Sequence, residues 1–163
     1  MNATKSLIFA AVLGVFGYAG GTSQAAEGPF AHFTGNWSGS GVITVQNGSR
    51  ERIRCRAHYV AREAGNGLGL LLRCASDSYK FELQSDISYD RGNITGSWNE
   101  ASRQIYGQLA GQATANRIDA KASSVGFNAI LSLTSRGNNQ TVSMKSPGSE
   151  ISEVTVALTR SSR

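Results

Sequence analysis

Apolar and polar residues alternate along most of this chain, and turn-forming residues break the alternation at short intervals. A period of two is typical of antiparallel β-strands, and the 3.6-residue period of an amphipathic helix is nearly absent after residue 26. Glycine interrupts almost every window in which a helix could extend. The pattern predicts ten short strands, at residues 37–46, 50–61, 68–75, 79–89, 93–99, 103–110, 113–122, 127–134, 141–145 and 154–160.

Short turn signals separate these segments. They are Asn47-Gly48, Gly65-Asn66-Gly67, Arg91-Gly92, Gly111, Arg136-Gly137-Asn138 and Pro147-Gly148. Connections of this length join neighbouring antiparallel strands, so the chain is compatible with a meandering barrel or a sandwich. We predict an all-β fold, an antiparallel meander of about 8–10 strands that closes into a β-barrel.

The spacing of the two cysteines supports this prediction. If the second and third strands form a hairpin, equal offsets from its turn place Cys55 directly opposite Cys74. The same register places Tyr59 opposite Leu70 on the same apolar face. A disulfide that closes a loop of about 20 residues would stabilise the fold by roughly 3 kcal/mol in the chain-entropy model. The alternative is a pair of free buried thiols.

The first 25 residues have the pattern of a secretory signal peptide. Lys5 supplies a positive charge, residues 7–20 are apolar, and residues 23–25 are small, as a signal peptidase requires. We therefore divide the chain into a signal peptide at 1–25 and a single barrel domain at 26–163, exported to the periplasm or outside the cell. No later segment is apolar enough for a second membrane span. An oxidising compartment would favour the disulfide.

The outward face of the second predicted strand is unusually basic. Its side chains are Arg50, Arg52, Arg54, Arg56 and His58, with Arg73 opposite on the next strand. A row of guanidinium groups suits an anionic lipid headgroup, an acidic glycan or a protein carboxylate. Nucleic acid is disfavoured because the chain is exported and no stacking aromatics lie between the arginines. The alternative is a solvated face whose arginines pair with Glu51, Glu82 or Asp77, or prevent edge-to-edge pairing of strands.

Catalytic and cofactor motifs are absent from the sequence. There is no GxSxG, HExxH, P-loop or CxxC pattern, and the two histidines have no carboxylate at a diagnostic spacing. We therefore expect a protein that is not an enzyme and that carries no metal or cofactor. The formal net charge of +5 permits contact with anionic material of the cell envelope.

Both tryptophans lie in the same short phrase, Thr-Gly-x-Trp. The first, FTGNW, resembles the Gly-x-Trp signature of the calycin superfamily, above all the lipocalins. In that family the tryptophan starts the first strand and packs across the closed base of the barrel, and an arginine near the last strand covers it. The resemblance assigns these structural roles to Gly35, Trp37 and Arg160. The second phrase, NITGSW, is similar to the first strand of avidin-type barrels. The two phrases and the general architecture therefore resemble an exported calycin-like barrel.

These observations lead to a binding protein as the expected function. A small apolar or amphipathic anionic ligand would lie inside the barrel, with any anionic head near the arginine row. Small residues on the strands would leave room for it: Gly96, Gly107, Ala110, Ala113 and Ala129. The residues expected to line the site are Trp98, Tyr59, Leu70, Leu72, Phe81 and Phe127.

A second function uses the outside of the same barrel. The chain would then be a protein-interaction or inhibitor module of the envelope with a solid core, and its arginine-rich strand would contact the partner.

Overall fold

The alternating segments form ten strands in the computed structural model, which describes residues 27–161; the predicted signal peptide lies outside the described residues. Two 3-10 turns accompany the strands, η1 (Ala31–Phe33) and η2 (Glu63–Gly65). No helix among residues 27–161 is long and apolar enough to cross a membrane. The strands are β1 (Gly35–Val45), β2 (Arg50–Arg62), β3 (Gly67–Ala75), β4 (Lys80–Asp90), β5 (Asn93–Glu100), β6 (Ile105–Thr114), β7 (Arg117–Ser124), β8 (Phe127–Arg136), β9 (Asn139–Lys145) and β10 (Ile151–Arg160).

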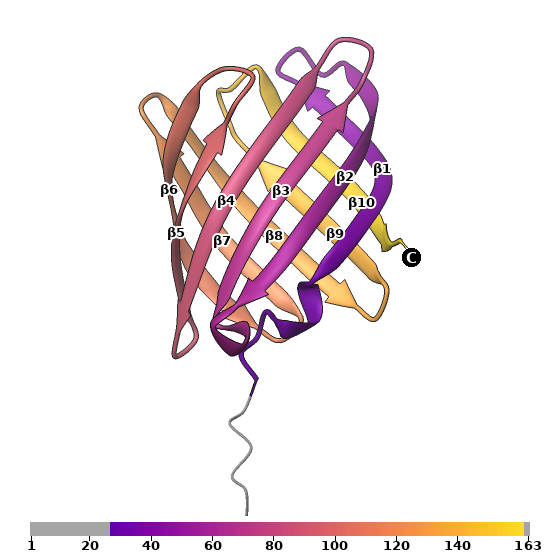
Figure 1. Ribbon diagram of the computed structural model, residues 1–163. Helices are drawn as coiled ribbons and strands as arrows, with labels where there is room; N and C mark the ends of the chain where they lie inside the picture. The colour runs from indigo at the N-terminus through magenta and orange to yellow at the C-terminus, as the bar shows by residue number, and fades with distance from the viewer. Residues whose placement is uncertain (1–26, 162–163) are drawn as a thin grey trace, which may run out of the picture.

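Every strand pairs antiparallel with its neighbours in sequence, and β1 pairs with β10 to close the sheet into a barrel (Figure 1). The closing register places Trp37 opposite Arg160. The prediction of an all-β closed barrel is thus confirmed, and the sandwich alternative is excluded. Closure also removes every free strand edge, because each strand has a hydrogen-bonded neighbour on both sides.

The hairpin of β2 and β3 has the predicted register. Cys55 lies opposite Cys74, and Tyr59 lies opposite Leu70. The two cysteines form a disulfide, so the alternative of free thiols is excluded. Both cysteine side chains point into the barrel, where the disulfide joins the middle of β2 to the C-terminal end of β3.

One predicted turn is wrong. Gly111 was expected to end a strand, but β6 continues through it to Thr114 and the chain turns at residues 115–116. Gly111 faces inward, and a Cβ there would overlap the backbone carbonyl of Asp119 on β7. The residue is therefore a place where two strands approach closely, a second structural use of glycine besides turns.

The same close approach occurs at other inward-facing glycines. A Cβ would overlap a carbonyl oxygen of the adjacent strand at five positions: Gly39, Gly41, Gly96, Gly107 and Gly111. Glycines of this kind allow a sheet to bend sharply as it closes. Gly96 and Gly107 were expected to leave room for a ligand. In the structure, the adjacent strand occupies the space that their side chains would fill. The prediction that Ala110 faces the interior is wrong, because Ala110 lies exposed on the outer face.

The N-terminal segment covers one end of the barrel, the lower end in Figure 1. Phe30 and Phe33 of this segment are fully buried, and Phe33 packs edge-on against Tyr59. The Trp37 indole donates a hydrogen bond to the Phe33 carbonyl at 2.9 Å. We call this end the base, and the opposite end the mouth.

Arg160 fastens the base from the last strand. Its guanidinium lies 4.3 Å from the centroid of the Trp37 ring and donates hydrogen bonds to the backbone carbonyls of His32 and Thr34. One side chain therefore connects β10, β1 and the segment that covers the base. This is the covering position that the calycin resemblance implies for Arg160.

Candidate ligand-binding site

Many apolar side chains that face into the barrel remain only half-buried. They come from walls on opposite sides of the barrel, β3 and β4 on one side and β8 and β9 on the other. A side chain that faces into a closed barrel can be exposed only to space inside the barrel or at its mouth. These residues therefore border space inside the barrel or at its mouth, which we call the hollow: Leu70, Leu72, Phe81, Leu83, Ile87, Ile105, Phe127, Leu131, Leu133, Val142, Met144 and Val154.

All six residues predicted to line a ligand site face inward, but they differ in exposure. Four are half-buried and border the hollow: Leu70, Leu72, Phe81 and Phe127. Trp98 and Tyr59 are only 8% and 3% exposed, so other protein atoms already cover most of their surfaces.

Trp98 is held against the wall of the barrel. Its indole nitrogen donates to the Gln108 carbonyl at 3.1 Å, and its ring lies over Gly107, where a Cβ would come within 2.8 Å of it. The free edge of the ring meets Phe127 in a T-shaped contact with centroids 5.5 Å apart. Trp98 thus positions Phe127, which borders the hollow.

Tyr59 belongs to the base. Its ring packs edge-on against both Phe33 and Trp37. Burial raises the pKa of Tyr59 well above its usual range, so the hydroxyl stays protonated.

Among residues 27–161, Gln140 is the one inward-facing residue whose side-chain polar atoms are all buried and have no hydrogen-bond partner. It lies on β9 between Ser135 and Leu158, is 1% exposed, and neither its amide nitrogen nor its amide oxygen has a partner among residues 27–161. By contrast, Ser85, Ser146 and Ser152 each donate to a backbone carbonyl of an adjacent strand. A buried amide without partners is costly, and at 1% exposure Gln140 is covered by protein atoms and does not border the hollow.

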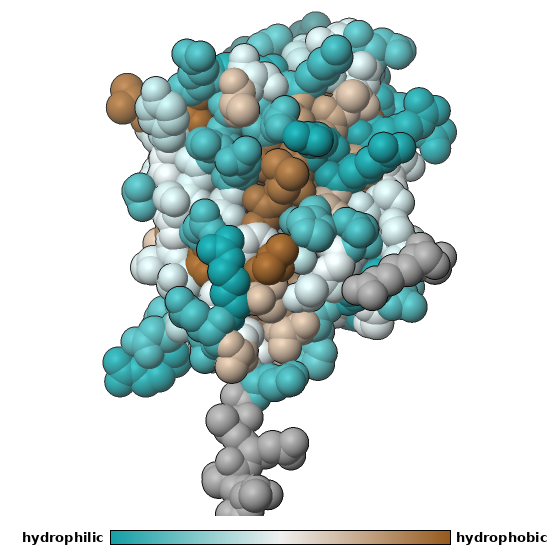
Figure 2. Space-filling view, viewed as in Figure 1, coloured by the Kyte–Doolittle hydropathy of each residue, from teal (hydrophilic) through white to brown (hydrophobic). Residues whose placement is uncertain are grey.

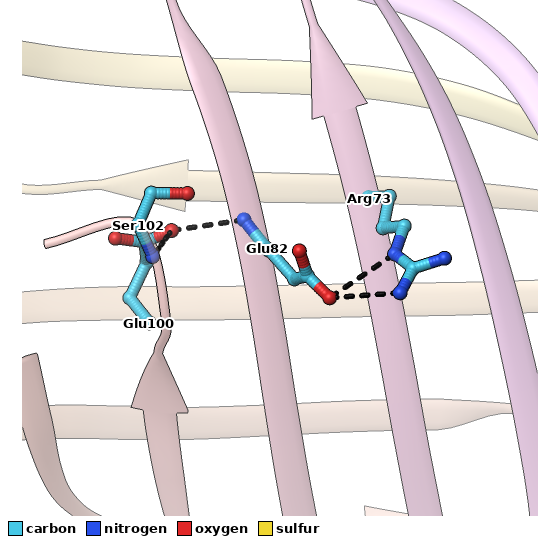
Figure 3. A network of polar contacts seen from close by, with 4 residues as sticks. All are labelled: Arg73, Glu82, Glu100 and Ser102. Carbon is cyan, nitrogen blue, oxygen red and sulfur yellow. Dashed lines mark hydrogen bonds and ion pairs between the residues drawn. The ribbon is translucent and has the colours of Figure 1, made fainter. Parts of the chain in front are cut away.

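The mouth is organised by Glu100, which is 7% exposed (Figure 3). Its carboxylate accepts hydrogen bonds from the backbone nitrogens of Glu82 at 2.8 Å, Ser102 at 3.2 Å and Arg103 at 2.8 Å. Burial by itself raises the pKa of this carboxyl, but the hydrogen bonds outweigh burial and hold it below the usual value of 4.5. Glu100 therefore stays ionised and fixes the turn between β5 and β6.

An aromatic pair lies beside this turn at the mouth. Tyr79 and Phe81 stack with their rings 6.3 Å apart, and the Arg103 guanidinium lies 5.0 Å from the Phe81 centroid. The Tyr79 hydroxyl donates to Glu150 at 3.1 Å, which connects the β3–β4 turn with the β9–β10 turn. Arg103 also lies 3.6 Å from the Glu100 carboxylate, so it is a paired cation beside the apolar ring of Phe81 at the mouth.

The predicted arginine row lies on the outer face of β2, as the alternation requires. Its side chains are exposed, whereas those of Ile53, Cys55 and Ala57 point inward from the same strand. The barrel wall therefore separates the row from the hollow, and a ligand inside cannot place its head there. This corrects the expected position of an anionic head, for which Arg103 at the mouth is the better placed cation.

Groups suited to metal binding do not gather in the described chain. Among residues 27–161, no three His, Cys, Asp or Glu side chains lie close enough to hold an ion. His58 faces outward and bonds through its Nδ1 to the Asn36 side chain at 2.8 Å.

Sequence reasoning missed several residues of the site. Leu83, Leu131 and Leu133 alternate inward on their strands like the predicted residues and could have been found by the same rule. Gln140 could not, because a glutamine at the start of a strand carries no signal of burial. Only the tertiary structure shows that Gln140 is buried inside the barrel, close to the base.

Comparison with known proteins supports the architecture. No protein-family model and no curated protein sequence matches the chain. Among solved structures, Rv2717c from M. tuberculosis matches with a TM-score of 0.60 and 13% identity, over 82% of this chain and 94% of that one. The S-type phycobiliprotein lyase CPES from Guillardia theta matches with a TM-score of 0.56 and 7% identity, over 82% and 91%. At such identities the likeness shows the fold alone, a closed antiparallel β-barrel.

Proposed function

We propose that the protein is an exported, non-enzymatic binding protein that holds one small apolar or amphipathic ligand inside the barrel. The observation that carries this proposal is that apolar side chains facing into the closed barrel from opposite walls stay only half-buried. Small barrels either fill this space with side chains or hold a ligand in it. The leader-like residues 1–25 and the disulfide support export.

The ends of the hollow indicate how an amphipathic ligand would lie. Its apolar body contacts the leucines of β3, β4 and β8, and an anionic head lies at the mouth beside Arg103. At the other end, the buried rings of Phe30 and Phe33 close the base. A fold shared with a lyase adds nothing to this assignment, because fold does not dictate function.

The proposal is tested by filling the hollow from one strand. Leu131 faces inward on β8, and its neighbour Ile130 faces outward with 59% exposure. We expect 8-anilinonaphthalene-1-sulfonate, an anionic amphipathic probe, to fluoresce on binding the wild type and Ile130→Trp. Leu131→Trp should bind it at least about fivefold more weakly, because an indole occupies the space. A cooperative thermal transition in each variant verifies folding.

Two results would overturn the carrier function. One is equal probe affinity in Leu131→Trp and Ile130→Trp, since the probe would then bind outside the barrel. The other is absence of probe binding together with a bare mass in native mass spectrometry of protein purified from its own cell envelope. An added mass that disappears on denaturation supports the proposal and identifies the ligand's chemical class.

A second function, contact with an anionic partner of the envelope, is favoured by one observation. No ion pair among residues 27–161 neutralises the arginines of the β2 row.

A further inference from the structure

The outer face of β2 carries four positive charges that no carboxylate of the described chain neutralises. Arg50, Arg52, Arg54 and Arg56 are exposed, and none takes part in an ion pair within the described chain. Of the acids once expected to neutralise them, Glu82 pairs with Arg73 at 2.8 Å. In Figure 2, hydrophilic side chains gather at the upper right of the view, over β1 and β2.

Protection against aggregation does not explain the row. Charged residues guard strands whose backbone hydrogen-bonding groups are free. β2 has hydrogen-bonded neighbours on both sides, β1 and β3, and the closed barrel leaves it no free edge. Four adjacent cations are therefore not needed to protect a strand edge.

The spacing of the row suits a linear anion. Alternate residues of a strand lie about 6.7 Å apart, so the four guanidinium groups extend over roughly 20 Å along one line. Because the outside of a barrel is convex, the neighbouring strands fall away from this line. Beside the row, the neighbours carry one further arginine, Arg73 opposite Arg56, and Glu82 pairs with it. A chain of repeating charges fits such a line better than a flat surface does.

A parallel row of hydroxyl groups lies beside the arginines. On β1, Ser38 is the register partner of Arg56, and Ser40 is the register partner of Arg54. Thr44 likewise lies opposite Arg50. Side-chain hydroxyls next to guanidinium groups can bind the sugar hydroxyls and the acidic groups of one polymer at the same time.

The surroundings disfavour nucleic acid. Single-stranded nucleic acid is held by aromatic side chains on which bases stack, and the outward residues of β1, β2 and β3 beside the row include none. At the His58 end of the row there is instead a surface depression of about 480 Å3, bordered by Asn36, Ser38, Arg56, His58, Leu71 and Arg73. Its lining joins polar side chains to the apolar Trp37, Ala57 and Leu71, and a sugar unit has both polar and apolar faces.

We propose that the outer face of β2 binds a linear acidic polysaccharide. The arginines grip its carboxylate or sulfate groups bidentately, the β1 hydroxyls bind its sugar hydroxyls, and one unit occupies the depression beside His58. This site is separate from the hollow and does not depend on a ligand inside the barrel.

The experiment compares two variants that lose the same charge. One is Arg52→Gln with Arg54→Gln and Arg56→Gln. The other removes three exposed cations elsewhere, Lys80→Gln with Lys121→Gln and Arg136→Gln. Binding to immobilised heparin and to polygalacturonate is measured at several salt concentrations, with melting temperatures as the folding control. We expect the β2 variant to lose affinity about tenfold or more with a weaker salt dependence, and the control variant to stay close to wild type.

Equal losses in the two variants would overturn the proposal, because net charge alone would then explain binding. So would absence of wild-type binding to both polysaccharides, or tighter β2-dependent binding to polyuridylate or to vesicles containing phosphatidylglycerol. The hydroxyl row is tested by Ser38→Ala with Ser40→Ala. This variant should weaken binding to polygalacturonate and leave binding to inorganic polyphosphate unchanged, since polyphosphate has no sugar hydroxyls. Equal weakening for both polymers contradicts recognition of a sugar.

Discussion

Glu100 and Gln140 are two buried polar side chains of this barrel that differ in whether hydrogen-bond partners satisfy them. Glu100 is charged and almost fully buried, yet three backbone N–H groups satisfy its carboxylate. Gln140 is neutral and equally buried, and its amide has no partner in the described chain. An unpaired amide costs stability, while a well-paired carboxylate adds to it. The burial of Glu100 is therefore explained by its hydrogen bonds, and no contact in the described chain explains that of Gln140.

Replacing Glu100 by glutamine should make the contribution of its charge visible. We expect Glu100→Gln to lower the free energy of unfolding by about 1 to 2 kcal/mol at pH 7, because the hydrogen bonds lose their charged acceptor. The folded-state pKa of Glu100 lies below the unfolded value of 4.5. The contribution is thus fully present above about pH 4.5 and is lost as the pH falls through the folded pKa.

Denaturant titrations from pH 7 towards pH 3 measure this difference. The gap between wild type and Glu100→Gln should narrow as the pH falls. The control is Glu153→Gln, which removes an exposed carboxylate 3.8 Å from Lys145 and should change stability by less than about 0.5 kcal/mol. A gap of constant size over this pH range would contradict the role of the ionised carboxylate.

At the scale of the strands, inward-facing glycines determine where the sheet bends. They occur on β1, β5 and β6, where the backbone of the adjacent strand occupies the place of a side chain. Glycine in a strand usually weakens it. Here glycine permits closure. The lack of a side chain, which weakens a single strand, allows two adjacent strands to approach closely.

Gly111 on β6 tests this role against a glycine of a different kind. A Cβ at Gly111 would overlap the rigid backbone of Asp119, whereas a Cβ at Gly69 would meet only the far end of the Arg62 side chain, which is 56% exposed and can move. Gly111→Ala should lower the free energy of unfolding by about 2 to 3 kcal/mol. Gly69→Ala should change it by less than about 1 kcal/mol. Chemical denaturation measures both, and equal effects would refute the close-approach argument.

At the scale of the whole molecule, the barrel is held by closure and by one covalent link. The pairing of β1 with β10 joins the two ends of the described chain, and Arg160 connects that seam to the covered base. The disulfide connects β2 and β3, which are already neighbours in one hairpin. Its main effect should therefore be on the unfolded chain, whose freedom it limits.

Removing the disulfide should lower stability without opening the barrel. The two cysteines are 19 residues apart. The loop that they close predicts a loss of roughly 3 kcal/mol for the double variant Cys55→Ser with Cys74→Ser. Circular dichroism should still show a β-rich fold, and wild type measured in reducing agent should have the stability of the variant. A loss below about 1 kcal/mol would show that the entropic argument does not apply to this hairpin.

Most of the fold could be predicted, because its signals are local. Asn47-Gly48 and Arg91-Gly92 were correctly identified as turns, and Gly48 and Gly92 have the positive φ that such turns require. Gly111 misled the same rule, since a glycine that serves a turn and a glycine that admits a neighbouring strand look alike in sequence. The alternation of β2 also predicted that its arginines share one face. It could not predict that they form no ion pairs, because that depends on where acidic residues distant in sequence lie.

The sequence by itself determined the strands, the face on which each side chain lies and the register of the disulfide hairpin. These follow from a period of two and from short turns, which act over neighbouring residues. Only the tertiary structure decided that Trp37 meets Arg160, that Trp98 is packed into the wall while Leu133 borders the hollow, and that Gln140 is buried without a partner. The reason is physical: burial inside a barrel is set by strands on its far side, which are far away in sequence and are brought near only by closure.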